Sequence, residues 1–306
     1  MTNLVVRRPA FRIDETVPFQ WQPANPAFGV FANAFTFLAP AFERYIVAAS
    51  REAMPRITDP AVRAEADAFL RQEAQHARAH RAHAKALIAQ FPDLEETLAN
   101  ANAMYDDLFE REGLDYHLAY IADLEATFTP LFKMIFDHRA SFFAGGDDRV
   151  GSLFLWHFAE EIEHRSSALI VQRHITPDPR YRLRQLRRVL AHVGKVFDGV
   201  LAGFEQHVPP EAAGIPLARV RNGASILSDE LKARARLRRR PPEVGAAPRM
   251  LEQVPTRDLA VMTWHVATSQ LPRHDPADAP LPAWADEWFS AYDEGDDVTT
   301  YEGARL

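Results

Sequence analysis

Cysteine is absent from the sequence. Its absence excludes disulfides, iron–sulfur clusters, thiolate zinc sites and cysteine nucleophiles in one step. Any bound metal must therefore be held by carboxylate oxygens and imidazole nitrogens.

Long apolar runs are missing as well. No stretch approaches the roughly 18 apolar residues that a membrane-spanning helix requires, and the first residues lack the basic start and apolar run of a secretory signal. The formal net charge of −7 argues against broad attraction to nucleic acid or anionic lipid. We therefore expect a cytoplasmic protein with no nucleic-acid partner and no stable membrane insertion.

Several catalytic signatures are also lacking. The sequence contains no Gly-x-Ser-x-Gly motif, no P-loop and no dinucleotide-binding fingerprint. Ser166 and Ser167 stand beside His164, but a metal would compete with them for that imidazole. A hydroxyl nucleophile is therefore not favoured.

The composition that is present suits a helical protein with a sizeable core. The chain has 306 residues, of which 47% are hydrophobic. Apolar residues recur at three- and four-residue intervals without convincing strand alternation, so the predicted fold class is all-α. We predict an irregular, proline-containing arm over 1–28, a helical bundle over 29–176, and additional helices with an acidic tail packed on the bundle over 177–306. The predicted helices cover 28–54, 60–91, 92–112, 114–143, 148–174, 181–207 and 216–240.

Pro130 lies inside the predicted helix 114–143. Proline cannot donate a backbone hydrogen bond, so we expect a kink or a widened turn just after Glu125. Irregular turns of this kind are frequent near functional sites.

The sequence contains two Glu-x-x-His motifs, Glu73 to His76 and Glu161 to His164. Each motif follows an isolated glutamate that lies one predicted helix earlier, Glu43 for the first and Glu125 for the second. The interval from each isolated glutamate to its motif suits one helix, a short turn and a return to the same height in the bundle. The longer gap between the first motif and the second isolated glutamate leaves room for a crossover. This is the layout of ferritin-like di-iron bundles. We therefore predict a ferritin-like four-helix bundle that holds two metal ions, with the ligands Glu43, Glu73, His76, Glu125, Glu161 and His164.

The motif spacing has a physical reason. A glutamate and a histidine three residues apart project from adjacent turns of one helix face, so both can reach one ion near the bundle axis. Each motif would then bind one ion, and the isolated glutamates would bridge or flank the pair. Without metal, four carboxylates facing one core would require protonation or hydration.

Two further histidines and one further glutamate share these faces. His80 lies one turn after His76, and His157 lies one turn before Glu161. Each histidine is either an additional ligand, a hydrogen-bond partner of a ligand, or a buried side chain satisfied by a neighbour. Glu160 is an alternative ligand to Glu161, although the helix phase favours Glu161. We retain His80, His157 and Glu160 as candidate catalytic residues.

A family resemblance covers about residues 17 to 175. The matching stretches are Trp21-x-Pro23-x-Asn25-Pro26, Phe35-Thr36-Phe37-Leu38-Ala39-Pro40-x-Phe42-Glu43, Phe69-x-x-Gln72-Glu73-x-x-His76 and Trp156-His157-x-x-Glu160-Glu161-x-Glu163-His164-Arg165. In these stretches the chain resembles a bacterial family of predicted metal-dependent hydrolases. The resemblance implies metal-bound glutamate and histidine at these positions, and it does not by itself imply hydrolysis.

The favoured functional hypothesis is a non-heme di-iron oxygenase or oxidase. Such an enzyme would use O2 and an unidentified electron donor to oxidise a small hydrophobic or amine-bearing substrate, and its ligands suit two iron ions or an iron–manganese pair. The alternative is a metal-dependent hydrolase in which zinc or manganese activates water at the dinuclear site. A ferroxidase or iron-binding protein is the second alternative, which the length of the chain beyond four helices disfavours. The oligomeric state, including a homodimer, is left open.

A basic run lies in the C-terminal third. No interleaved aromatic residues and no known binding motif accompany it, so we interpret it as a solvated helix face or a contact with a partner. The run comprises Lys232, Arg234, Arg236, Arg238, Arg239 and Arg240.

Overall fold

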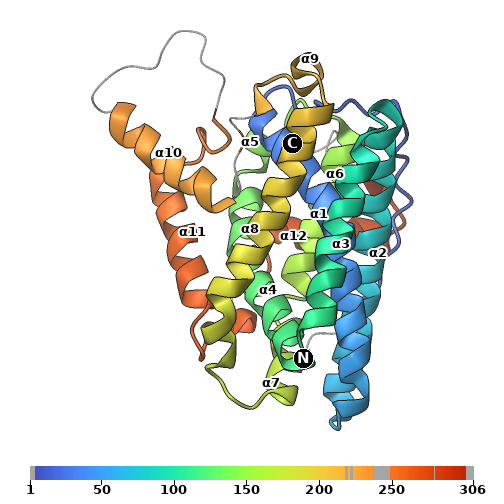
Figure 1. Ribbon diagram of the computed structural model, residues 1–306, viewed down its shortest axis with the longest axis vertical. Helices are drawn as coiled ribbons and strands as arrows, with labels where there is room; N and C mark the ends of the chain where they lie inside the picture. The colour runs from blue at the N-terminus through green and yellow to red at the C-terminus, as the bar shows by residue number, and fades with distance from the viewer. Residues whose placement is uncertain (1–3, 218–219, 221–222, 238–248, 279, 301–306) are drawn as a thin grey trace.

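The structure is a computed structural model. It describes residues 4–217, 220, 223–237, 249–278 and 280–300, with the backbone alone at 223–225, 236 and 237. Every regular element in these ranges is helical (Figure 1). The all-α prediction is therefore confirmed.

Four helices enclose a common interior. They are α1 (Pro26–Ala53), α2 (Pro60–Gln90), α4 (Leu114–Asp137) and α6 (Asp148–Glu163). Helix α1 packs against both α2 and α4, and α6 also packs against both α2 and α4. Helix α7 (Ser167–Ile175) follows α6 along the chain and contacts the same two neighbours.

Further helices cover this arrangement. Helix α3 (Leu94–Arg111) packs on α1, and α8 (Tyr181–His207) packs across α1, α3 and α4. Helix α11 (Thr256–Ser269) packs on α4, and α12 (Ala283–Asp293) packs on α6. Together with α10 (Gly223–Leu237), α11 forms the side of the molecule remote from α2 and α3 (Figure 1). The short elements are η1 (Met54–Arg56), α5 (Arg139–Phe143), α9 (Pro210–Ala213), η3 (Pro276–Asp278) and η4 (Val298–Thr300).

Side-chain caps fix where α1 and α2 begin. The Asn25 side chain accepts a hydrogen bond from the Phe28 amide, and Pro26 occupies the first turn of α1. The Asp59 side chain accepts from the amides of Ala61 and Val62. Caps of this kind satisfy amides that have no partner within the helix. Helix α1 thus begins two residues before the predicted start at residue 28.

The predicted helix 148–174 is wrong, because the structure contains two helices there. Helix α6 ends at Glu163, His164 follows with φ −91° and ψ 12°, and α7 begins at Ser167. The Ser167 amide donates to the His164 carbonyl at 2.8 Å, which closes a turn in place of the helical ladder. Serine has a lower helix propensity than alanine or leucine, so the consecutive Ser166 and Ser167 favour a break here.

The predicted helix 114–143 is also divided. Helix α4 continues through Pro130 and ends at Asp137, so the predicted range is interrupted at His138. The kink expected just after Glu125 stays a prediction. The predicted helix 216–240 corresponds, within the described residues, to α10 alone. None of the described helices combines the length and apolar character needed to cross a membrane.

The basic run is only partly a solvated face. Lys232 is exposed and pairs with Asp229 at 3.4 Å. Arg234 instead pairs with Glu230 at 2.6 Å and donates to the carbonyls of Leu251 and Val254, both at 2.7 Å. It therefore anchors the segment before α11, which corrects the prediction at this position. Residues 238–240, and the side chain of Arg236, lie outside the described part of the chain.

Candidate metal centre

The six predicted ligands all point into the interior enclosed by α1, α2, α4 and α6. Each has an exposed fraction of 4% or less. On α1, Glu43 is buried together with Thr36 and Ala39, which share its helix face. The structure therefore gathers ligand-type side chains from four helices in one dry region.

The first group of potential ligands joins the two Glu-x-x-His motifs. It comprises Glu73 and His76 of α2, Glu161 of α6 and His164 immediately after α6, with one ligand atom of each within 4.8 Å of the others. The Nε2 atom of His164 is 3.2 Å from Glu73 Oε1 and 3.5 Å from Glu161 Oε1. The Nδ1 atom of His76 is 3.4 Å from Glu161 Oε1. These atoms are close enough together to share one ion.

The second group consists of Glu43, His80 and His157. The Nε2 atom of His157 is 3.6 Å from Glu43 Oε1, and the Nε2 atom of His80 is 2.6 Å from His157 Nδ1. The His157 Nε2 atom also lies 2.8 Å from Glu161 Oε1. Glu161 is therefore within reach of both groups.

This grouping differs from the predicted one. Each Glu-x-x-His motif was expected to hold its own ion, but α2 and α6 are neighbours, so the two motifs face each other and form one group. The two histidines whose role the sequence left open, His80 and His157, supply most of the second group. Glu125 lies outside both groups, with its Oε2 atom 3.4 Å from His164 Nδ1.

The hydrogen bonding of these side chains fits a metal centre. Buried polar groups in proteins are normally paired, because an unpaired one carries a desolvation cost. Here, a set of buried atoms in the same interior has no hydrogen-bond partner within the described part of the chain: both carboxylate oxygens of Glu73 and of Glu125, one oxygen each of Glu43 and Glu161, both ring nitrogens of His164 and Nδ1 of His76. Divalent ions would satisfy such a set of oxygen and nitrogen donors.

Burial also shifts the protonation equilibria of the carboxylates. Desolvation, together with the nearby Glu161, raises the pKa of Glu125 to about 8. Burial likewise raises the pKa of Glu43 well above its usual range. For Glu161 the neighbouring His164 and His157 outweigh burial, and its pKa lies well below the usual value. Metal binding would replace the protons that the metal-free interior must carry.

Glu160 lies on the outer side of His76. Its Oε2 atom accepts a hydrogen bond from His76 Nε2 at 2.9 Å, and its Oε1 atom accepts one from Arg7 Nη1 at 3.2 Å. Glu160 therefore contacts a potential ligand and belongs to neither ligand group. The grouping of Glu161 with the ligands agrees with the helix phase.

Two residues near the centre were missed by the sequence analysis. His83 is fully buried, and Thr36 Oγ1 lies 2.9 Å from His83 Nδ1 and 3.0 Å from His80 Nδ1. His83 follows His80 by one turn on the same helix face, and this spacing was the signal that could have identified it. Arg7 belongs to no motif, and only the folded structure brings it to Glu160.

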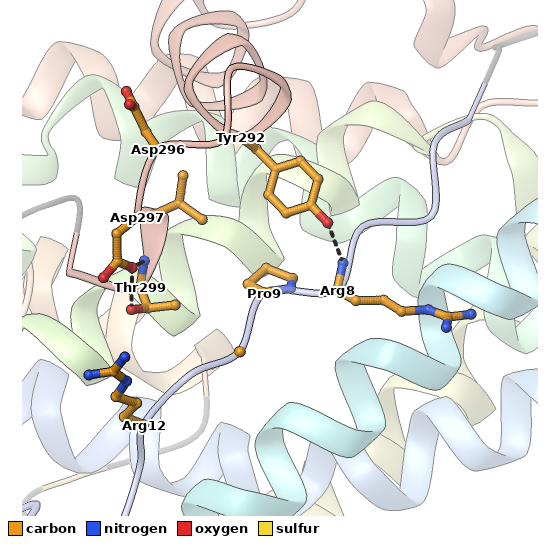
Figure 2. Close-up of a pocket in the computed structure, with 10 residues that line it drawn as sticks. Arg8, Pro9, Arg12, Tyr292, Asp296, Asp297 and Thr299 are labelled. Atoms are coloured by element: carbon orange, nitrogen blue, oxygen red, sulfur yellow. Dashed lines mark hydrogen bonds between the residues drawn. The ribbon is translucent and has the colours of Figure 1, made fainter.

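A separate surface cavity lies beside the N-terminal arm (Figure 2). Its volume is about 310 Å³, and its lining includes Arg8, Arg12, Tyr292 and Asp297 but no member of either ligand group. The Arg8 amide donates to the Tyr292 hydroxyl at 3.0 Å. The arm is therefore held by the segment that contains and follows α12.

Comparison with known families gives one match. Residues 5–208 match the family described as predicted metal-dependent hydrolase. The matched range includes both ligand groups, Glu160 and Arg7. No match was found among curated proteins or among solved structures, so the ferritin-like character of the bundle stays a prediction.

Proposed function

Because the chain belongs to the family of predicted metal-dependent hydrolases, we propose that it is a hydrolase that activates water at a dinuclear centre held by the two buried Glu/His groups. The observation that carries this proposal is that the two groups of potential ligands converge on Glu161 in one interior. An isolated buried Glu/His pair would offer too few donors for two ions.

The donor set limits which metals the centre would bind. The two groups offer imidazole nitrogens and carboxylate oxygens, and the chain has no thiolate. Zinc, manganese and iron accept such ligands. When bound, a pair of these ions lowers the pKa of a coordinated water and polarises a substrate oxygen.

The surrounding side chains orient the ligands and exclude bulk water. The ring of Phe35 lies 5.6 Å from His80 and 5.4 Å from His157, between ring centroids. The rings of Trp156 and Phe69 lie 4.9 Å from those of His76 and His164, respectively. This apolar wall strengthens electrostatic interactions inside the centre, because it keeps the local dielectric low.

Metal-dependent hydrolysis under argon is the decisive test. Metal-free protein should be loaded with zinc, manganese or iron(II) and assayed with nitrophenyl carboxylate esters and nitrophenyl phosphate esters. We expect metal-dependent release of nitrophenol without O2 or an electron donor. Glu161→Gln should lower both the metal content and the turnover, since Glu161 belongs to the first group and lies within reach of the second.

A matched pair of variants on α1 controls for the change of charge. Glu43→Gln alters a buried potential ligand, whereas Glu52→Gln alters an exposed glutamate on the same helix. Only Glu43→Gln should reduce the metal content. Equal metal content in the two variants, or turnover that needs both iron and O2, would contradict the proposal.

Oxidation with O2 is the second candidate function. The observation in its favour is the donor set itself, since two groups of imidazole and carboxylate ligands also suit a pair of iron ions. The family match supports hydrolysis rather than oxidation. O2 consumption after anaerobic reduction of the iron-loaded protein separates the two functions.

A further inference from the structure

Arg7 reaches the candidate metal centre from the N-terminal arm. Its side chain is 3% exposed. The guanidinium lies between Glu160 and Glu163 on one side and the ring of Phe289 on α12, at 3.9 Å from the ring centroid, on the other. A buried guanidinium is costly unless its charge and its donors are matched, so this placement depends on the two carboxylates.

The two carboxylates contact Arg7 differently. Glu163 accepts from Nη1 at 2.9 Å and from Nη2 at 3.1 Å, and it also accepts from Gln72 Nε2 at 2.7 Å. Gln72 Nε2 donates in addition to the Val5 carbonyl at 2.9 Å. Glu163 and Gln72 thus anchor the arm. Glu160, in contrast, links Arg7 directly to His76.

The link through Glu160 determines which His76 nitrogen faces the centre. A carboxylate only accepts, so the 2.9 Å contact places a proton on His76 Nε2. The Nδ1 atom then points toward Glu73 and Glu161 and has no hydrogen-bond partner among the residues that the structure describes. A metal-binding histidine is commonly oriented in this way by a carboxylate on its other nitrogen.

We propose that Arg7 is a positioning residue, which through Glu160 fixes the orientation and tautomer of His76 so that Nδ1 is presented to the metal. Arg7 holds one oxygen of Glu160 while His76 holds the other, and this restricts the Glu160 side chain to one rotamer. This role rests on the proposed metal centre and deepens it, because it makes the N-terminal arm part of the site. The carboxylate beside His164 Nδ1 is that of Glu125, at the longer distance of 3.4 Å.

The first experiment reads the proton on His76 Nε2 in metal-free protein, independently of any activity. Nitrogen-15 spectra of the histidine rings, with the His76 signals assigned from a His76→Gln variant, should show a slowly exchanging proton on Nε2. Arg7→Gln should broaden or shift that signal. The matched control is Arg8→Gln, which changes an exposed arginine next to Arg7 on the arm and should leave the signal unchanged.

The second experiment measures zinc affinity in a double-mutant cycle. Arg7→Gln should weaken zinc binding by about 10- to 100-fold, and Arg8→Gln by less than about twofold. In the Glu160→Gln background, Arg7→Gln should have little further effect, because the two residues act through one contact. Additive losses would show that Arg7 only anchors the arm through Glu163, and they would overturn the proposal.

A second substitution separates the positive charge of Arg7 from the geometry of its donors. Arg7→Lys keeps the positive charge but replaces the fork of donors with a single ammonium group, so it cannot hold both carboxylates in the same geometry. An unchanged His76 signal in Arg7→Lys and Arg7→Gln would overturn the proposal. Absence of hydrolysis with normal zinc binding and the expected His76 signals would instead contradict the proposed function alone.

Discussion

The imidazole of His83 is a buried group that lies just outside the candidate ligand set. It is fully buried, its Nε2 atom has no hydrogen-bond partner, and burial lowers the pKa of His83 to about 3. An unfolded histidine titrates near ~6.5. The folded state therefore favours the neutral ring. Its contribution to stability is complete above the unfolded pKa and is lost as the pH falls from there toward the folded pKa.

His83→Gln tests this assignment, because glutamine can still hydrogen bond to Thr36 and does not titrate. Between about pH 7.5 and about pH 5.5, the unfolding free energy of the wild type should fall by about 1.4 kcal/mol more than that of the variant. Urea unfolding of the metal-free proteins at the two pH values measures the difference. His265→Gln, a change at an exposed histidine of α11, is the control. Parallel pH dependence of His83→Gln and wild type would refute the assignment.

At the residue scale, the sequence predicted which side chains gather in the bundle interior, but not how they divide between the two groups of potential ligands. Helix periodicity was sufficient to place Glu43, Glu73 and Glu161 in one interior, because a helix face is a local property. The membership of the two groups depends on the relative rotation and height of α2 and α6. Tertiary packing sets those quantities. Arg7 was beyond prediction for the same reason, since its contacts lie more than a hundred residues away along the chain.

At the element scale, helices bounded by caps and prolines were predicted well. The predicted range 181–207 matches α8, and Asp59 caps α2 as its position before Pro60 indicated. The failures lie where no strong breaker stands in the sequence. The break between α6 and α7 begins at His164, which turns out of the helix, and the break after α4 lies at His138.

A buried ion pair connects α8 and α11 to α4, one of the four helices that enclose the candidate centre. Arg182 of α8 is 4% exposed and donates to Asp123 of α4 at 3.0 Å. It also donates to the Gln270 side chain at 2.7 Å and to the Ser269 carbonyl at 3.0 Å, at the end of α11. This arginine therefore joins α8 and α11 to the helix that carries Glu125.

Replacement of Arg182 should be strongly destabilising. Arg182→Met keeps most of the apolar stem but leaves Asp123 and the end of α11 without a donor, so we expect a loss of about 3 kcal/mol in unfolding free energy. The matched control is Arg184→Met on the same helix. Arg184 forms an exposed pair with Asp178, and its loss should cost less than about 1 kcal/mol. Chemical denaturation of both variants measures the difference, and equal losses would show that the buried pair has no special role.

At the scale of the whole molecule, the buried carboxylates make the metal-free protein less stable than its core would allow. Glu43, Glu73 and Glu125 all have raised pKa values, mainly because of burial. Folding without metal must therefore either protonate these groups or bury their charge. Proteins commonly retain such unfavourable clusters because function requires them. Stability and metal binding should thus respond in opposite directions to one substitution.

Glu73→Gln provides this test of the whole assembly. Removal of one carboxylate should raise the melting temperature of the metal-free protein, because the repulsion with Glu161 disappears. Zinc at about 100 times its dissociation constant should stabilise the wild type by about 2.7 kcal/mol. For a chain of 306 residues, that corresponds to a rise of roughly 4 °C in the melting temperature. The Glu73→Gln variant should lose most of this stabilisation by zinc. A calorimetric scan of each protein with and without zinc gives both quantities, and a variant that is destabilised without metal yet still responds fully to zinc would show that Glu73 is a structural residue outside the metal centre.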